Sequence, residues 1–94
     1  MNADLCEPGW AEKICLQLVN HPHFNVRGNA VLGLGHIART CRKLNLELAV
    51  PAITVALQDP HDFVRGHAFT SAESLGVYLG VKVPGFEEPS WDDV

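Results

Sequence analysis

The chain lacks features that mark several classes of protein. No apolar run approaches the roughly 20 residues that a membrane-spanning helix needs. Its first residues, Met1 to Asp4, hold no basic segment followed by an apolar stretch, so no export signal is predicted. Charged residues make up 19% of the 94 residues and hydrophobic residues 47%, which is typical of a folded globular chain. We therefore expect a single folded domain in the cytoplasm, with no membrane partner.

Cysteine is scarce and irregularly spaced. The three cysteines, Cys6, Cys15 and Cys41, form no Cys-x-x-Cys pair, so the sequence predicts neither a zinc site nor a disulfide framework. Cys15 and Cys41 fall at apolar helical positions, where we expect buried free thiols in a reducing compartment. The five histidines show no ligand spacing either, and no metal or cofactor is predicted.

Motifs of catalysis and of nucleic-acid binding are missing as well. The chain has no nucleophile elbow, no phosphate-binding glycine loop and no His-Glu-x-x-His pair, so we do not expect an enzyme. Proteins that grip nucleic acid carry basic stripes, but residues 1–83 hold seven basic and seven acidic side chains. A nucleic-acid partner is therefore not predicted.

The chain does contain an internal repeat. Residues 21–30 align with residues 59–68 at an offset of 38, and six of the ten positions are identical. The same offset also aligns apolar positions, namely Cys15 with Ile53, Val19 with Leu57 and Ile37 with Leu75. A motif and a hydrophobic pattern that repeat together indicate two copies of one structural unit.

The first copy predicts two helices. Apolar residues recur at helical spacing up to Pro22, whose ring disfavours helical geometry in the residue before it. Asn25 is the predicted N-cap of the second helix, which carries apolar residues on one face as far as Leu44.

The second copy follows the same plan. Its first helix is predicted to begin near Leu48, because Pro51 fits a helix only in the first turn. Asp62 is the predicted N-cap of the last helix, which Gly80 and Pro84 end. The fold class predicted from both copies is all-α.

An apolar helix, then Asp-Pro-x-x-x-Val-Arg, then a helix rich in small and aliphatic residues resembles the HEAT-repeat family. The second copy carries the motif as Asp59, Pro60, Val64 and Arg65, whereas the first has His21 where the family usually has an aspartate. The resemblance covers nearly the whole chain. It implies two helix–turn–helix repeats, with four antiparallel helices in a short right-handed α-α stack.

Arg27 and Arg65 lie in the first turns of the second helices, where a cation opposes the helix dipole. We expect a carboxylate to compensate, with Arg27 reaching Asp59 of the next turn, and the family resemblance implies such a ladder between repeats. Gly28 and Gly66 follow the two arginines. Glycine inside a helix costs about 1 kcal/mol relative to alanine, so we expect a neighbouring element to pack closely against each.

The net charge of −4 is confined to the C-terminal end. Residues 1–83 are predicted to form the helical domain, and residues 84–94 an acidic tail. The tail combines two aromatic residues with four acidic ones, namely Phe86, Trp91, Glu87, Glu88, Asp92 and Asp93. Such a tail suits apolar anchoring with attraction to a basic surface. Alternatively, its aromatic residues fold back and cover the exposed end of the stack.

A small acidic protein of HEAT type without catalytic motifs is similar to bacterial immunity proteins, which bind and neutralise a cognate toxin. The chain is therefore predicted to bind another protein with a basic surface. The expected contacts are the tail residues named above, together with Asn29 and His36 of the second helix. The alternative is a scaffold or adaptor subunit of a cellular complex. Two repeats are few for a solenoid, so a compact monomer, an oligomer and a unit completed by its partner all remain open.

Overall fold

A computed structural model describes residues 9–86, and their secondary structure is entirely helical. The predicted all-α class is confirmed. The four helices are α1 (Trp10–Leu18), α2 (Phe24–Cys41), α3 (Leu46–Ala56) and α4 (Asp62–Ser74), and α4 continues into a π-helical turn, η2 (Leu75–Leu79). Over the described range, no helix has the length and apolar character required to cross a membrane.

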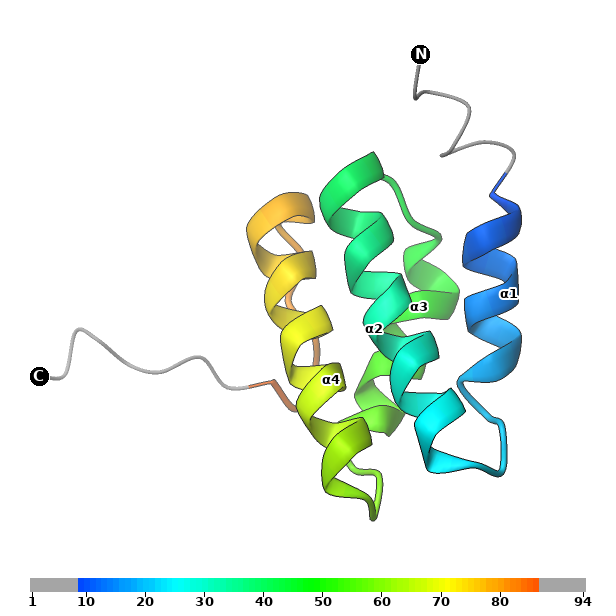
Figure 1. Ribbon diagram of the computed structural model, residues 1–94. Coiled ribbons are helices and arrows are strands. Elements are labelled where there is room, and N and C mark those ends of the chain that lie inside the picture. The colour runs from blue at the N-terminus through cyan, green and yellow to red at the C-terminus, as the bar shows by residue number, and fades with distance from the viewer. Residues whose placement is uncertain (1–8, 87–94) are drawn as a thin grey trace, which may run out of the picture.

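The core lies between α2, α3 and α4. Figure 1 shows α2 between α1 and α4, with α3 behind α2. The contact between α2 and α4 is the most extensive in the molecule. The buried apolar side chains of this core are Val31, Leu34, Ala38, Ala49, Ile53, Ala56, Val64, Ala68, Ala72, Leu75 and Val83. None of them comes from α1, so that helix packs on the outside of a core built by the other elements.

The helix α1 is attached to the core by partly buried side chains and by a hydrogen bond. The carboxylate of Glu12 accepts a hydrogen bond of 2.7 Å from the backbone N–H of Asn45, just before α3. The thiol of Cys15 packs on Gly33, where an added Cβ would lie 2.7 Å from the sulfur atom. Burial raises the pKa of the Cys15 thiol, and the Glu12 carboxylate adds to the shift, so the thiol is protonated at neutral pH.

The helices α2 and α4 approach closely because small residues face each other. At Gly35 an added Cβ would lie 2.7 Å from Cα of Ser71, and at Gly28 it would lie 2.5 Å from the ring of Phe63. Ser71 is buried, and its hydroxyl donates a hydrogen bond of 2.6 Å to the carbonyl oxygen of Val31. The expected close packing is confirmed at Gly28. It is wrong at Gly66, where no atom of the described residues lies within 4 Å of an added Cβ.

The N-caps of α2 and α4 are histidines. Nδ1 of His23 accepts a hydrogen bond of 3.1 Å from the N–H of Asn25, and Nδ1 of His61 accepts one of 3.3 Å from the N–H of Phe63. The predicted caps, Asn25 and Asp62, are therefore wrong, because both residues already belong to their helices. A neutral imidazole nitrogen accepts the same bond as the side-chain oxygen of the usual capping residues.

The helix α3 begins at Leu46, earlier than the predicted start near Leu48. Pro51 is consequently inside the helix, beyond the first turn, and supplies no N–H to the carbonyl oxygen of Glu47. Both residues are exposed, so water can replace the missing hydrogen bond. Solvent access at this position makes the longer helix possible.

The helix α2 ends at Cys41 rather than at the predicted Leu44. Arg42 adopts the left-handed conformation with φ 54°, and its guanidinium carbon lies 5.1 Å from the ring centroid of Tyr78. Cys41 is half-buried and disulfide-bonded, so the expectation of a buried free thiol is wrong at this position.

The chain beyond η2 returns along the helices. Val83 is buried in the core, and the ring centroid of Phe86 lies 4.9 Å from that of Phe69 on α4. Phe86 therefore folds back onto the helices, which is the alternative expected for this aromatic residue. The other tail residues singled out in the sequence lie outside the described range, namely Glu87, Glu88, Trp91, Asp92 and Asp93.

The glycines of α2 and α4 predict opposite effects of one substitution. Gly35→Ala places a methyl group against the backbone of Ser71, so we expect a loss of about 1 to 3 kcal/mol in the free energy of unfolding. Gly66→Ala meets open space and removes the helix penalty of glycine, so we expect a gain of about 0.5 to 1 kcal/mol. Urea denaturation measures both. Equal effects of the two substitutions would contradict the close approach at Gly35.

Candidate functional site

Arg27 joins the two interhelical turns. Its Nε and Nη2 atoms donate hydrogen bonds of 2.9 and 3.1 Å to the two carboxylate oxygens of Asp59. Its Nη1 atom donates to the carbonyl oxygens of His21, at 3.1 Å, and Pro22, at 2.9 Å. The predicted contact between Arg27 and Asp59 is confirmed, in the planar two-bond form that arginine and carboxylate favour.

The two turns repeat each other in their hydrogen bonds. The N–H of His23 donates to Nδ1 of His21 at 3.0 Å, and the N–H of His61 donates to Oδ1 of Asp59 at 2.9 Å. His21 thus accepts the same local bond as the aspartate at the equivalent position. It provides no carboxylate, so only the second turn can form an ion pair with an arginine of its neighbour.

Arg65, the repeat equivalent of Arg27, has a different set of partners. Its Nη1 atom donates a hydrogen bond of 2.6 Å to the carbonyl oxygen of Asp59, as Arg27 does to that of His21. Its Nη2 atom pairs with the carboxylate of Asp62 on the same helix. The compensating carboxylate expected for Arg65 therefore comes from its own helix rather than from another turn.

A row of rings lies beside the ion pair. Phe24 stacks on His61 with ring centroids 3.7 Å apart and packs edge-on against Phe63 at 5.8 Å. Phe63 also packs edge-on against His67 at 4.4 Å. At this end of the molecule, histidines therefore cap the starts of α2 and α4 and pack against phenylalanine rings. Among residues 9–86, no group of three or more histidine, cysteine or acidic side chains could hold a metal ion.

The hydrogen bond from Arg27 holds the pKa of Asp59 below its usual range. The N–H of His61 lowers this pKa further, while burial of the carboxyl group opposes the shift. The carboxylate is thus charged at neutral pH. Asp59 also lines a hollow of the surface.

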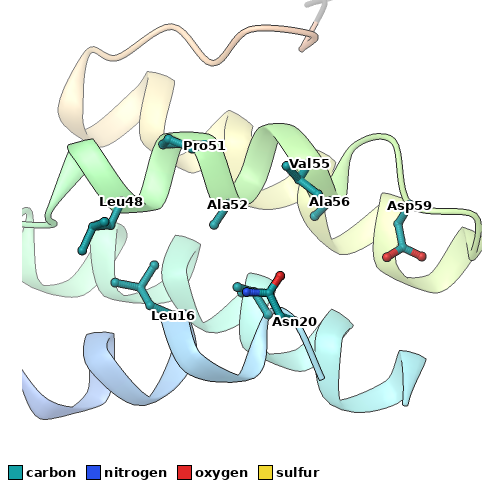
Figure 2. A pocket seen from close by; sticks show the side chains of 9 residues that line it. Leu16, Asn20, Leu48, Pro51, Ala52, Val55, Ala56 and Asp59 are labelled. Atoms are coloured by element: carbon teal, nitrogen blue, oxygen red, sulfur yellow. The ribbon is translucent and has the colours of Figure 1, made fainter. Parts of the chain in front are cut away.

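That hollow is a groove between α1 and α3 with a volume of about 330 Å³. Figure 2 shows Leu16 and Asn20 on one side and Leu48 and Ala52 on the other, with their side chains directed into the space between. The full lining consists of Leu16, Val19, Asn20, Leu48, Pro51, Ala52, Val55, Ala56 and Asp59. Most of these side chains are apolar.

Two large apolar side chains of the groove are open to solvent. Leu48 is 55% exposed and Val55 is 68% exposed. The sequence contained a signal for this site. The helix α3 has only two polar side chains, Glu47 and Thr54, and a helix that is apolar on every side cannot bury all sides in a small domain.

The predicted contact residues lie elsewhere. Asn29 is exposed on α2, and its Nδ2 atom donates a hydrogen bond of 2.8 Å to Asn25. His36 is exposed on the same helix, and its Nδ1 atom lies 3.0 Å from Nη2 of Arg39. It borders a small hollow of about 50 Å³ between α2 and α4. Phe86 lies against α4. The structure therefore does not gather these three residues around one site.

Comparisons with protein-family models, with curated proteins and with solved structures find no match to this chain. Its function is therefore argued from its own surface and electrostatics.

The Arg27–Asp59 pair makes stability depend on pH. Because the folded-state pKa of Asp59 is lowered from 3.8, the pair contributes fully above that pH and its contribution is lost as the pH falls through the folded-state pKa. We expect Asp59→Asn to be less stable than the wild type at neutral pH and to approach it in strong acid. Thermal unfolding across the acid range measures the difference.

Arg27→Ala is the companion variant. It leaves a mostly buried carboxylate without its main donor, so we expect a loss of about 1 to 3 kcal/mol at neutral pH. Unchanged thermal stability of Arg27→Ala, or an Asp59→Asn deficit that persists undiminished in acid, would contradict this account of the pair.

Proposed function

We propose that the chain is a protein-binding module and that the groove between α1 and α3 is its main contact surface. The observation that carries the proposal is the exposure of Leu48 and Val55 on the α3 side of an apolar groove. Apolar surface of this kind is expensive to leave in water and commonly marks an interaction site. The volume of about 330 Å³ suits one or two apolar side chains of a partner as anchors.

The helix α1 also carries exposed apolar residues on the side away from the groove. Trp10, Ile14 and Leu18 recur at intervals of four residues and are each exposed. They follow one side of the helix that forms one wall of the groove. Leu16, which lines the groove, points away from Ile14 and Leu18 around the helix, so these exposed residues form a second apolar strip, separate from the groove.

The charge distribution favours a basic partner. The net charge of −4 comes from the four acidic residues after Phe86, since residues 1–83 are balanced. A cluster of one sign raises the rate of encounter with an oppositely charged surface. In this proposal the groove provides apolar affinity, and Glu87, Glu88, Asp92 and Asp93 attract the partner's basic residues.

We propose that the two helix pairs are HEAT-like repeats in an antiparallel, right-handed stack. The 38-residue sequence offset and the equivalent hydrogen bonds of the two turns support this arrangement. Among binding modules of this kind, the small size and acidic charge favour an immunity protein that neutralises a cognate toxin. The alternative role is a HEAT-type scaffold or adaptor subunit.

Co-expression separates these two roles. An immunity protein should restore growth to cells that produce the toxin encoded beside its gene. An adaptor should instead copurify with the subunits of a larger complex and give no protection.

The groove predicts a matched pair of variants. Val55→Glu places a charge in the apolar contact, so we expect the affinity for the copurifying partner to fall about tenfold or more. Val77→Glu is the control, because Val77 has the same 68% exposure but lies in η2, away from the groove. Isothermal titration calorimetry measures both affinities. Equal binding by the two variants would contradict the groove assignment.

Removal of residues 87–94 tests the electrostatic part separately. This truncation keeps Phe86 and its contact with Phe69. We expect weaker binding at low salt and little change at high salt, because salt screens exposed charges. A truncated chain that binds as tightly as the full chain at low salt would exclude a role for the tail.

A further inference from the structure

The outer side of α4, opposite α2, repeats part of the surface that α2 presents to α4. Gly66 is equivalent to Gly28, which the ring of Phe63 covers, yet within residues 9–86 no atom lies within 4 Å of an added Cβ at Gly66. Phe69 is equivalent to the fully buried Val31, yet it is 42% exposed. This side of α4 thus has the small residue and the apolar residue of a helix contact without the covering helix.

Charged residues flank Phe69 symmetrically. Arg65 lies four residues before it and Glu73 four residues after it, about one helical turn in each direction. When two α4 helices cross antiparallel at Phe69, Arg65 of each copy lies opposite Glu73 of the other. A two-fold interface requires such self-complementarity, because the same patch serves both partners.

We propose that the outer side of α4 binds a second copy of this chain in a symmetric dimer. Phe69 of each copy meets Phe69 of the other at the crossing point, and Gly66, one turn earlier on the same side, lets the two helices approach closely. Phe86, which lies against Phe69, enlarges the apolar centre of the contact. The Arg65 guanidinium is held at the start of α4 by the carboxylate of Asp62 and the carbonyl oxygen of Asp59.

The dimer leaves the groove accessible. In Figure 1, α1 and α4 lie on opposite sides of α2, so a copy bound at α4 is remote from the α1 side of the groove. A dimer would present two grooves and would bind a multivalent partner with increased avidity. The proposal does not depend on what the groove binds.

Charge exchange between Arg65 and Glu73 tests the contact on the full chain by sedimentation equilibrium. We expect a concentration-dependent dimer for the wild type. Arg65→Glu and Glu73→Arg each place like charges opposite one another, so we expect both variants to dimerise at least about tenfold more weakly. The double variant should regain the wild-type affinity. An equimolar mixture of the two single variants should form the heterodimer, since each then faces the opposite charge.

Lys13→Glu and Glu47→Arg are the controls, because they reverse exposed charges on α1 and α3. Both should dimerise like the wild type. A wild-type chain that stays monomeric into the millimolar range overturns the proposal. So does a double variant that dimerises no better than the single ones.

Gly66→Ala gives an independent measurement. In the monomer the methyl group meets no described atom within 4 Å and should stabilise α4, but in the dimer it should hinder the close approach of the second α4 helix. We expect a higher unfolding midpoint at low concentration together with dimerisation at least about tenfold weaker. A stabilised chain that dimerises normally would show that α4 does not contact a second copy through Gly66.

Discussion

The arrangement of the helices depends on the hydrogen bonds of one guanidinium group. Arg27 binds the carbonyl oxygens of its own turn and the carboxylate of the next, so it fixes the start of α2 relative to the start of α4. Its position in turn brings Phe63 onto Gly28 and allows Gly35 to meet Ser71 further along the two helices. The close contact between α2 and α4 is thus set at one end by polar chemistry and continued by small residues, while α3 completes the core behind them.

Sequence reasoning found the parts of the fold that repeat. The 38-residue offset predicted two similar turns, and the cost of a cation in a first helical turn predicted the partner of Arg27. It failed where the residue preferences of helix caps and helix starts are overridden by the surrounding structure. Histidine is not a preferred N-cap, but the conformation of each turn directs Nδ1 of His23 and His61 toward the helix. Pro51 was expected in a first turn. It lies further inside α3 because the carbonyl oxygen of Glu47, which lacks an N–H donor there, is open to water.

The candidate site was harder to predict than the fold. Apolar residues in α3 were assigned to the core, and Ala49 and Ile53 are indeed buried, whereas Leu48 and Val55 face the groove. Periodicity identifies a helix but does not say which side remains uncovered when apolar residues occupy all of them. Similarly, the helix penalty of glycine predicted a close neighbour at both Gly28 and Gly66, and the sequence repeat alone does not reveal that only Gly28 has one among the described residues.

The absence of buried side chains from α1 has a mechanical consequence for the groove. One wall, α3, belongs to the cooperative core, while the other is joined to it mainly through partly buried side chains and the bond between Glu12 and Asn45. Opening of α1 therefore requires less free energy than global unfolding, so the amides of α1 should exchange with solvent before those of α2 and α4. The shape of the groove therefore depends on how firmly α1 is held against the core. A ligand that bridges its walls increases the stability of α1 and couples the ordering of this helix to recognition.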